Sequence, residues 1–330
     1  MENNLFILVS GYCWSGSSAV VDLLKEYSCN IDPGIEFRLI KDPYGINDLY
    51  NAMVVKGDPL NCDIAIKDYL WFVECLNRKP SKLKHGLNYQ SYFGDNLLKY
   101  TQEYINRLVQ YKYDAYWWMF DLKRDKLDML IYKLKLKFLH KKEQPQMYFS
   151  NITEKSFCEE TNTYINKLLL DVVGENKDKN IILDQAVSVF NAPNEMKFLK
   201  NRKLIVVDRD PRDVYTELCK GGFLIGEQLI KTRNPMMYVD WHNAWRRNIK
   251  QLENNNDILQ IKFEDLIIDY ADTVKKIEKF LNLDKNMHVF AGEYLDVNMS
   301  KKNVGIWKGF LNNEEIKVFD KYLGNFYYSK

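Results

Sequence analysis

Two glycines and several hydroxyl side chains lie close together near the start of the chain, where residues 11–18 read GYCWSGSS. An apolar run at 5–9 precedes them, and an apolar pattern of helical spacing follows through Leu23 and Leu24. A loop that joins a strand to a helix offers backbone N–H groups and the positive end of the helix dipole to a phosphate. We therefore predict an anion-binding loop, with a simple tight turn as the alternative. Its candidate binding residues are Cys13, Trp14, Ser15, Gly16, Ser17 and Ser18.

The spacing of the two glycines is that of a Walker A loop, but Ser17 stands where such a loop has its lysine. That lysine contacts the β- and γ-phosphates of ATP, so its absence argues against ATP hydrolysis. Cys13 lies in the same loop, but no neighbouring histidine is present in the sequence to activate its thiol. We therefore interpret Cys13 as a loop residue rather than as a nucleophile.

A dense cluster of charge follows an apolar run at residues 207–214, which read VDRDPRDV. Pro211 is placed to open the next helix. Ligands of open α/β sheets bind at the carboxyl ends of the strands, so we predict that Arg209 binds a phosphate. Arg212 and Asp213 are interpreted instead as parts of a salt-bridged helix start.

A third segment combines adjacent lysines with a glycine and a tryptophan, at residues 301–308, which read KKNVGIWK. Such a loop is suited to close over a phosphorylated nucleotide and to stack on its base. A solvated basic turn is the alternative interpretation. The candidate binding residues here are Lys301, Lys302 and Asn303.

Taken together, the three segments resemble those of sulfotransferases that use 3′-phosphoadenosine 5′-phosphosulfate (PAPS). Residues 11–18 resemble the family's 5′-phosphosulfate loop, 207–214 its 3′-phosphate strand and helix, and 301–308 its C-terminal basic segment. The sequence IKFEDL at 261–266 is similar to another recurrent stretch of the family. The resemblance implies PAPS as co-substrate, 3′-phosphoadenosine 5′-phosphate (PAP) as product, and transfer of sulfonate to a hydroxyl group without a metal.

The chain departs from the family pattern at two positions. Family members carry lysine or arginine where Trp14 stands, and that cation neutralises the bridging oxygen of the leaving phosphate. They also carry a serine where this chain has Glu217, next to Thr216. The resemblance therefore implies that another cation replaces the one missing at Trp14, and that Thr216 takes over from the serine.

A general base is implied by the resemblance as well. Glycosaminoglycan-type members place a glutamate at a set distance after the loop cation, and the same offset counted from Trp14 reaches Glu36. Arg38 and Lys41 are the nearby candidates for the missing cation. The branch that acts on small molecules uses a histidine base, but no matching motif surrounds the histidines of this chain, which are His85, His140, His242 and His288.

The elements that must position these residues follow from the apolar runs. Besides residues 5–9, such runs occur at 65–66, 181–183, 204–207 and 258–261, and each is followed later by helical periodicity. This alternation predicts an α/β fold with a central parallel sheet flanked by helices, in the P-loop nucleotide-kinase-like architecture of sulfotransferases. We expect one domain over 1–330.

A helical insertion on the acceptor side is predicted at about 88–149, where lysines, leucines and aromatic residues recur at helical spacing. It includes a basic stretch at 132–142. Aromatic residues of this kind form either core or an acceptor pocket. They fit a hydrophobic alcohol, such as a steroid or a lipid, as well as a carbohydrate, and they are Tyr113, Tyr116, Trp117 and Trp118.

Composition narrows the class of protein further. The 330 residues carry a formal net charge of +2, which does not indicate wholesale binding of nucleic acid. Six cysteines without C-x-x-C pairs predict reduced thiols, and the apolar run at 5–9 is too short for a signal peptide or a membrane span. We therefore expect a cytoplasmic enzyme. A P-loop kinase and a non-catalytic nucleotide-binding relative remain the alternatives.

Overall fold

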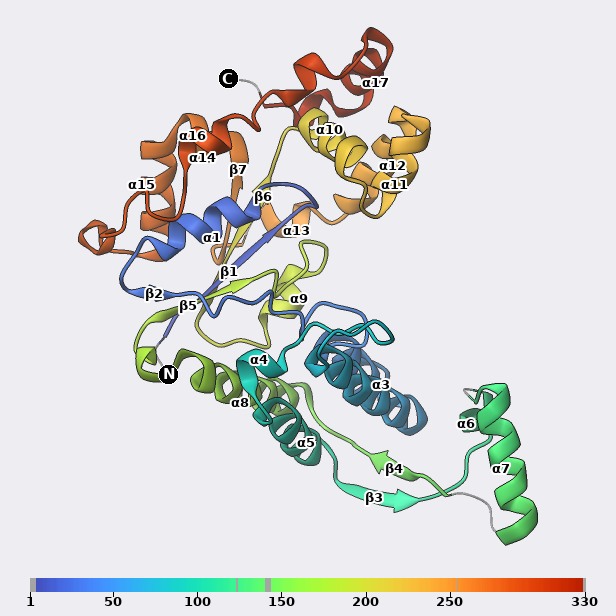
Figure 1. Ribbon diagram of the computed structural model, residues 1–330. Coiled ribbons are helices and arrows are strands. Elements are labelled where there is room, and N and C mark those ends of the chain that lie inside the picture. The colour runs from blue at the N-terminus through green and yellow to red at the C-terminus, as the bar shows by residue number, and fades with distance from the viewer. Residues whose placement is uncertain (1–3, 123, 140–143, 254, 329–330) are drawn as a thin grey trace. The chain divides into compact units, whose positions relative to one another are not determined.

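A five-stranded parallel sheet forms the centre of the larger part of the chain in the computed structural model (Figure 1), which describes residues 4–122, 124–139, 144–253 and 255–328. Every neighbouring pair in this sheet is parallel, which confirms the predicted fold class. In spatial order the strands are β2 (Asn30–Ile31), β5 (Asn180–Asp184), β1 (Phe6–Gly11), β6 (Arg202–Asp208) and β7 (Ile258–Lys262).

The described residues divide into two compact units, one comprising Met1–Asp42 with Ile165–Lys330 and the other Pro43–Tyr164. The sheet belongs to the first unit. Its helices are α1 (Ser17–Lys25), α9 (Ala192–Met196), α10 (Pro211–Gly221), α11 (Ile225–Thr232), α12 (Pro235–Trp245), α13 (Lys250–Glu253), α14 (Phe263–Ile268), α15 (Tyr270–Leu281), α16 (Val297–Lys301) and α17 (Asn313–Leu323), with short 3-10 turns at Gly174–Asn176, Lys285–Met287, Ile306–Gly309 and Gly324–Phe326.

The core of the first unit forms because its strands are apolar on both faces, as in other covered parallel sheets. On one face, Ile7 and Val9 of β1 pack with Leu23 of α1 and with Leu266 and Ile277 of α14 and α15. A second cluster joins α10, α11, α12 and α17. These helices hold the carboxyl ends of β1, β5, β6 and β7 at one edge of the sheet, where the candidate residues lie.

The second unit contains a π-helical turn at Asn51–Lys56 and an antiparallel pair of strands, β3 (Tyr111–Asp114) and β4 (Gln146–Phe149). Its helices are α2 (Ile46–Tyr50), α3 (Pro59–Asn77), α4 (Gln90–Phe93), α5 (Asn96–Leu108), α6 (Met119–Leu122) and α7 (Lys126–Leu139). The boundary between the units falls within α8 (Glu154–Val173).

Two features of the second unit differ from the sequence prediction. The segment expected to be helical contains the strands β3 and β4 in addition to its helices. The strand predicted at residues 65–66 is wrong, because these residues lie inside α3. Asp58 caps this helix by accepting from the N–H groups of Leu60 and Asn61, and Pro59 opens it. Among the described residues, no helix is both long and apolar enough to cross a bilayer.

Candidate functional site

The loop between β1 and α1 depends on left-handed backbone at two positions, Trp14 with φ 61° and Gly16 with φ 81°. Only glycine adopts such a φ without cost. At Gly16 a second reason applies, because a Cβ atom would lie 2.4 Å from the ring of Phe263. The second glycine of the predicted loop is therefore required by both its backbone conformation and the close approach of α14.

The start of α1 has the properties of an anion site. Gly16 precedes the helix and has no side chain to cap it, so no side chain at this position accepts a hydrogen bond from the first backbone N–H groups of α1. The hydroxyl of Ser15 is buried, with 2% of the residue exposed, and it has no hydrogen-bond partner among the described residues. Buried polar groups in proteins are nearly always paired. The unpaired hydroxyl and the open helix start together fit a bound anion.

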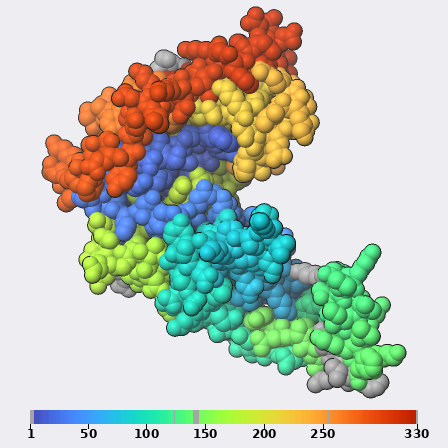
Figure 2. All heavy atoms as spheres, viewed as in Figure 1, coloured from blue at the N-terminus to red at the C-terminus, as the bar shows by residue number. Residues whose placement is uncertain are grey.

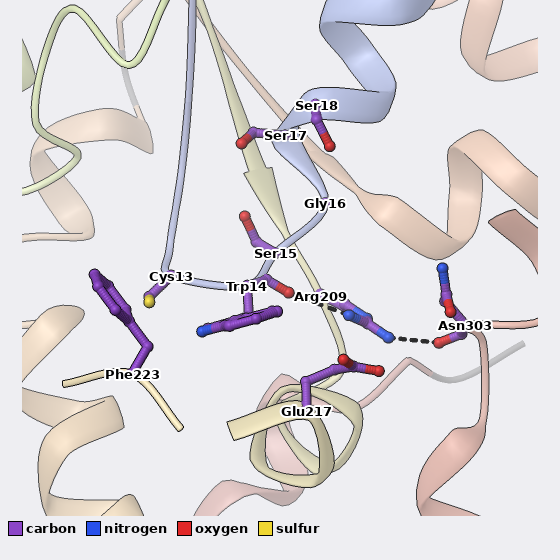
Figure 3. Close-up of a pocket in the computed structure, with 10 residues that line it drawn as sticks. All are labelled: Cys13, Trp14, Ser15, Gly16, Ser17, Ser18, Arg209, Glu217, Phe223 and Asn303. Atoms are coloured by element: carbon purple, nitrogen blue, oxygen red, sulfur yellow. Dashed lines mark hydrogen bonds between the residues drawn. The ribbon is translucent and has the colours of Figure 1, made fainter. Parts of the chain in front are cut away.

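Arg209 joins the three segments that the sequence singled out. It follows β6 and is almost fully buried, with 5% exposed. One nitrogen of its guanidinium donates to the carbonyl of Trp14 over 3.2 Å, and another donates to the carbonyl of Asn303 (Figure 3). The Nε atom has no hydrogen-bond partner within the described part of the chain. This cation therefore connects the glycine loop to the C-terminal segment.

A cavity of about 540 Å³ opens beside this arginine, which is within the usual size range of small-molecule sites. Figure 3 shows Glu217 of α10 in the same cavity as Arg209, and Phe223 near Trp14. The pocket thus combines one cation and one carboxylate with two aromatic rings. Its lining residues are Cys13, Trp14, Ser15, Gly16, Ser17, Ser18, Arg209, Glu217, Phe223 and Asn303.

Three of the predicted binding residues do not line this cavity. Thr216 is fully buried, and its hydroxyl donates to the carbonyl of Arg212 over 2.8 Å, one turn back in α10. Because this hydroxyl already has a partner within α10, the role of Thr216 as the replacement for the family's serine stays a prediction. Lys301 and Lys302 are exposed at the end of α16, and only Asn303 from their segment reaches the pocket.

Glu36 and Arg38 form an ion pair of 2.6 Å, and the same arginine also pairs with Asp42 at 2.8 Å. Glu36 makes an isolated parallel bridge with Asp184, the last residue of β5. The predicted base therefore lies beside the carboxyl end of a strand that neighbours β1. Neither Glu36 nor Arg38 is among the residues that line the cavity.

Lys41 is linked to the glycine loop through a residue that the sequence analysis missed. Its Nζ atom donates to Gln185 Oε1 over 2.9 Å, and Gln185 Nε2 donates to the hydroxyl of Ser17 over 2.9 Å. Burial lowers the pKa of Lys41, although the carboxylate of Asp42 opposes this. Gln185 directly follows β5, so its place after an apolar run was the signal that could have identified it.

Asp184 is the second residue that was missed. Burial, with a further contribution from the nearby carboxylate of Glu36, raises its pKa to about 6, while Lys41 acts in the opposite direction. Its Oδ1 atom has no hydrogen-bond partner among the described residues. Perturbed carboxyl groups of this kind are concentrated at functional sites.

The segment at 261–266 packs against Arg209 and its neighbour Asp210. Glu264 accepts a hydrogen bond from the backbone N–H of Asp210 over 2.8 Å, and the ring of Phe263 lies 5.2 Å from the guanidinium carbon of Arg209. Burial raises the pKa of Glu264 to about 7. This segment thus fixes both the arginine and, through Phe263, the close approach of Gly16.

Asp213 holds the C-terminal loop against α10. It accepts hydrogen bonds from the backbone N–H groups of Gly305, over 2.7 Å, and Trp307, over 3.0 Å. Burial raises the pKa of Asp213, and these two hydrogen bonds counteract that shift. Arg212 pairs with Asp210 at 2.6 Å and lies over the ring of Trp307. The predicted salt-bridged helix start is confirmed for Arg212, whereas Asp213 binds the backbone of the loop.

The histidines that the structure describes lie apart from the cavity. His242 is buried on α12, where burial and the neighbouring Arg246 lower its pKa to about 3, and it packs against Phe326. His288 pairs with Glu26 at 2.7 Å. His85 makes no contribution to the pocket lining, and His140 lies outside the described residues.

Cys13 is described with a free thiol, and burial raises its pKa to about 11. A thiol with such a pKa is a poor nucleophile at neutral pH, in agreement with its interpretation as a loop residue. The other five cysteines are also free. Within the described ranges, no group of three or more His, Cys, Asp or Glu side chains is arranged to hold a metal ion.

No family model matches the sequence, and no curated protein matches it either. The solved structures named here, to which the fold is similar, are all sulfotransferases. The sulfotransferase domain of the Synechococcus PCC 7002 olefin synthase is 14% identical with a TM-score of 0.41, and the match covers 97% of this chain and 94% of that chain. Sulfotransferase STF9 from Mycobacterium avium is 13% identical with a TM-score of 0.40, covering 99% and 77%.

Mouse sulfotransferase SULT7A1, which was solved in complex with PAP, is 15% identical with a TM-score of 0.33. The match covers 45% of this chain and 66% of that chain, just under two thirds of its length. At these identities and TM-scores the likeness is distant, and it identifies no individual site residue.

Proposed function

We propose that this chain is a PAPS-dependent sulfotransferase that transfers a sulfonate group to a hydroxyl. The proposal is carried by two features found in one pocket. The first is the open start of α1 with the buried, unpaired hydroxyl of Ser15. The second is Arg209, which donates to the carbonyls of both Trp14 and Asn303. The N–H groups at the helix start suit the 5′-phosphosulfate, and Arg209 suits the 3′-phosphate. Ser17 in place of a lysine disfavours the kinase alternative.

In the proposed reaction, the acceptor oxygen forms a bond to sulfur while the bond from sulfur to the bridging phosphate oxygen breaks. Both electrons of the broken bond stay with the phosphate oxygen, and PAP leaves. The acceptor proton passes to the carboxylate of Glu36, which Arg38 holds at 2.6 Å. The N–H groups at the start of α1 stabilise the charge that develops on the leaving phosphate. Lys41, linked through Gln185 to Ser17, is the proposed replacement for the missing loop cation.

The donor is tested first by calorimetric titration with PAP and, separately, with ATP, each with and without magnesium. We expect PAP to bind in a metal-independent manner and ATP to bind far more weakly. Arg209→Ala is expected to weaken PAP binding by about tenfold or more, because it removes charge-assisted contacts. Arg202→Ala is the matched control, since Arg202 begins the same strand and pairs with Asp257 on the surface. Preference for ATP with magnesium would overturn the proposal in favour of a kinase.

The acceptor is tested by incubating the enzyme with PAPS labelled in its sulfonate group and two classes of hydroxyl compound, carbohydrates and hydrophobic alcohols. Tyr113, Tyr116 and Trp117 are the acceptor-binding candidates that the sequence offers, because aromatic rings pack against both classes. Transfer of label to one class assigns the acceptor. PAP binding without transfer to either class would favour a non-catalytic nucleotide-binding protein, which Glu217 in the pocket also favours.

A further inference from the structure

Helix α7 exposes a continuous apolar face. Five of its side chains recur at spacings of three and four residues, so they share one side of the helix. All five are exposed, from 46% for Leu134 to 75% for Phe138. Monomeric soluble proteins rarely leave such a row of large side chains in water. The residues of this apolar face are Leu127, Leu130, Ile131, Leu134 and Phe138.

The opposite side of α7 carries less exposed residues. Tyr132 is buried, and the guanidinium of Arg124 lies 4.2 Å from the centre of its ring. Met129 and Leu136 are partly buried on the same side. Within the second unit, α7 follows α6 at the end of the β3 and β4 hairpin (Figure 1), and the space-filling view shows this green segment reaching outward (Figure 2). The apolar face is therefore the more exposed side of the helix.

Charge and neighbouring side chains indicate what covers this face. Lys126, Lys133 and Lys137 are exposed and lie along one border of the apolar face at helical spacing. On the adjacent α6 region, Trp118 is 57% exposed and Leu122 is 67% exposed. Lysines bordering a face of leucine, phenylalanine and tryptophan are typical of helices that lie in a membrane interface.

We propose that α7 and the adjacent Trp118 and Leu122 bind the surface of a bilayer that contains anionic lipids. With its 14 residues α7 is too short to span the hydrocarbon layer, so it lies parallel to the membrane plane. The apolar face enters the boundary between headgroups and acyl chains, and the three lysines contact the lipid phosphates. This surface goes beyond the proposed sulfonate transfer and does not depend on it.

The test is co-sedimentation of the full chain with vesicles of phosphatidylcholine alone and with vesicles of equal parts phosphatidylcholine and phosphatidylglycerol. We expect binding to the anionic vesicles only, and weaker binding as salt is raised. The triple variant Lys126→Gln, Lys133→Gln, Lys137→Gln is expected to lower binding about a hundredfold, because each lysine near an anionic surface contributes about fivefold. Its control replaces three exposed lysines of α15, Lys275, Lys276 and Lys279, by glutamine.

The apolar contribution is tested separately with the double variant Leu130→Gln, Phe138→Gln, for which a loss of about tenfold or more is expected. Leu83→Gln is its control, because Leu83 is 94% exposed outside this face. Circular dichroism verifies that each variant is folded. Absence of binding by the native chain, or equal binding by both α7 variants and their controls, would overturn the proposal. A native dimer in sedimentation velocity that dissociates in the double variant would assign the face to self-association instead.

Discussion

Gln185 donates a hydrogen bond from its side-chain nitrogen to the hydroxyl oxygen of Ser17 over 2.9 Å. The oxygen of the same amide accepts from Lys41, also over 2.9 Å. An ammonium group can only donate, so Lys41 fixes which end of the amide is the oxygen. Ser17 therefore acts as acceptor toward Gln185, and its own hydrogen is directed elsewhere. Because Ser17 begins α1, this hydrogen can be donated to an anion at the helix start.

This relationship predicts the effect of Gln185→Glu. The new carboxylate accepts from both Lys41 and Ser17, so the serine hydrogen is withdrawn from the anion site and a negative charge is added beside it. We expect the affinity for PAP to fall by about tenfold or more, measured by calorimetry. Gln251→Glu on the exposed side of α13 is the control for the added charge. Unchanged affinity in Gln185→Glu would contradict the role of this amide.

The role proposed for Glu36 leads to a second prediction. Glu36→Gln is expected to bind PAP normally and to lose about 10²–10⁴-fold in kcat, because the amide cannot accept the acceptor's proton. Asp42→Asn is the matched control, since Asp42 is the other carboxylate paired with Arg38. A fully active Glu36→Gln enzyme would exclude Glu36 as the base.

Glu217 shares the pocket with Arg209 and opposes the binding of a phosphate there. Glu217→Gln removes this negative charge, so the affinity for PAP is expected to rise by about fivefold, which corresponds to the interaction of about 1 kcal/mol between two unit charges about 4 Å apart in bulk water. The gain should decrease as salt is added. Glu227→Gln on α11 controls for the change in net charge. A decrease in affinity would instead assign Glu217 a direct contact with the ligand.

The raised pKa of Asp184 predicts how stability depends on pH. Its pKa is about 6 in the folded chain against an ordinary value of 3.8, so the folded state binds more protons between these values. Its contribution to the free energy of unfolding is therefore full below pH 3.8 and is lost as pH rises through 6. We expect Asp184→Asn to be more stable than the native chain at pH 7.5 by on the order of 1–3 kcal/mol.

Urea unfolding at a series of pH values measures this difference. The gap between Asp184→Asn and the native chain should narrow as the pH falls through 6 and close below pH 3.8, where the carboxyl group is protonated in both states. Asp257→Asn serves as the control, since Asp257 is a surface carboxylate paired with Arg202 at 3.7 Å. A gap that stays constant with pH would show that the substitution acts through packing rather than through the charge.

The parts of the fold that the sequence predicted are those with strong local signals. The apolar runs at 5–9, 181–183, 204–207 and 258–261 are strands, and all four belong to one parallel sheet. The two residues of β2 are too few to produce such a run. The run at 65–66 is helical instead, because a capping aspartate at Asp58 and the following Pro59 start a helix that continues through it.

The site was predictable where one motif supplies several of its residues, as the loop at 11–18 does. The site was not predictable where its residues come together only because their strands are neighbours in the sheet. Asp184 and Gln185 lie near the loop because β5 pairs with β1 in the sheet, and this pairing depends on contacts between distant parts of the chain. The sequence also does not show which of Thr216 and Glu217 reaches the cavity. The helical phase of α10 decides this, because it buries Thr216 and places Glu217 in the cavity lining.

The contacts of Arg209 also set the order in which the pocket is completed during synthesis. The two carbonyls that it binds belong to Trp14 and Asn303, which lie 195 and 94 residues from it along the chain. The ribosome delivers these segments one after another, and N-terminal regions begin to fold first. The nascent protein therefore has an unclosed glycine loop until the residues beyond 303 emerge and dock on Asp213. The proposed nucleotide binding is therefore expected only once these residues have been synthesised, and a chain that stops before residue 303 is expected to bind PAP weakly.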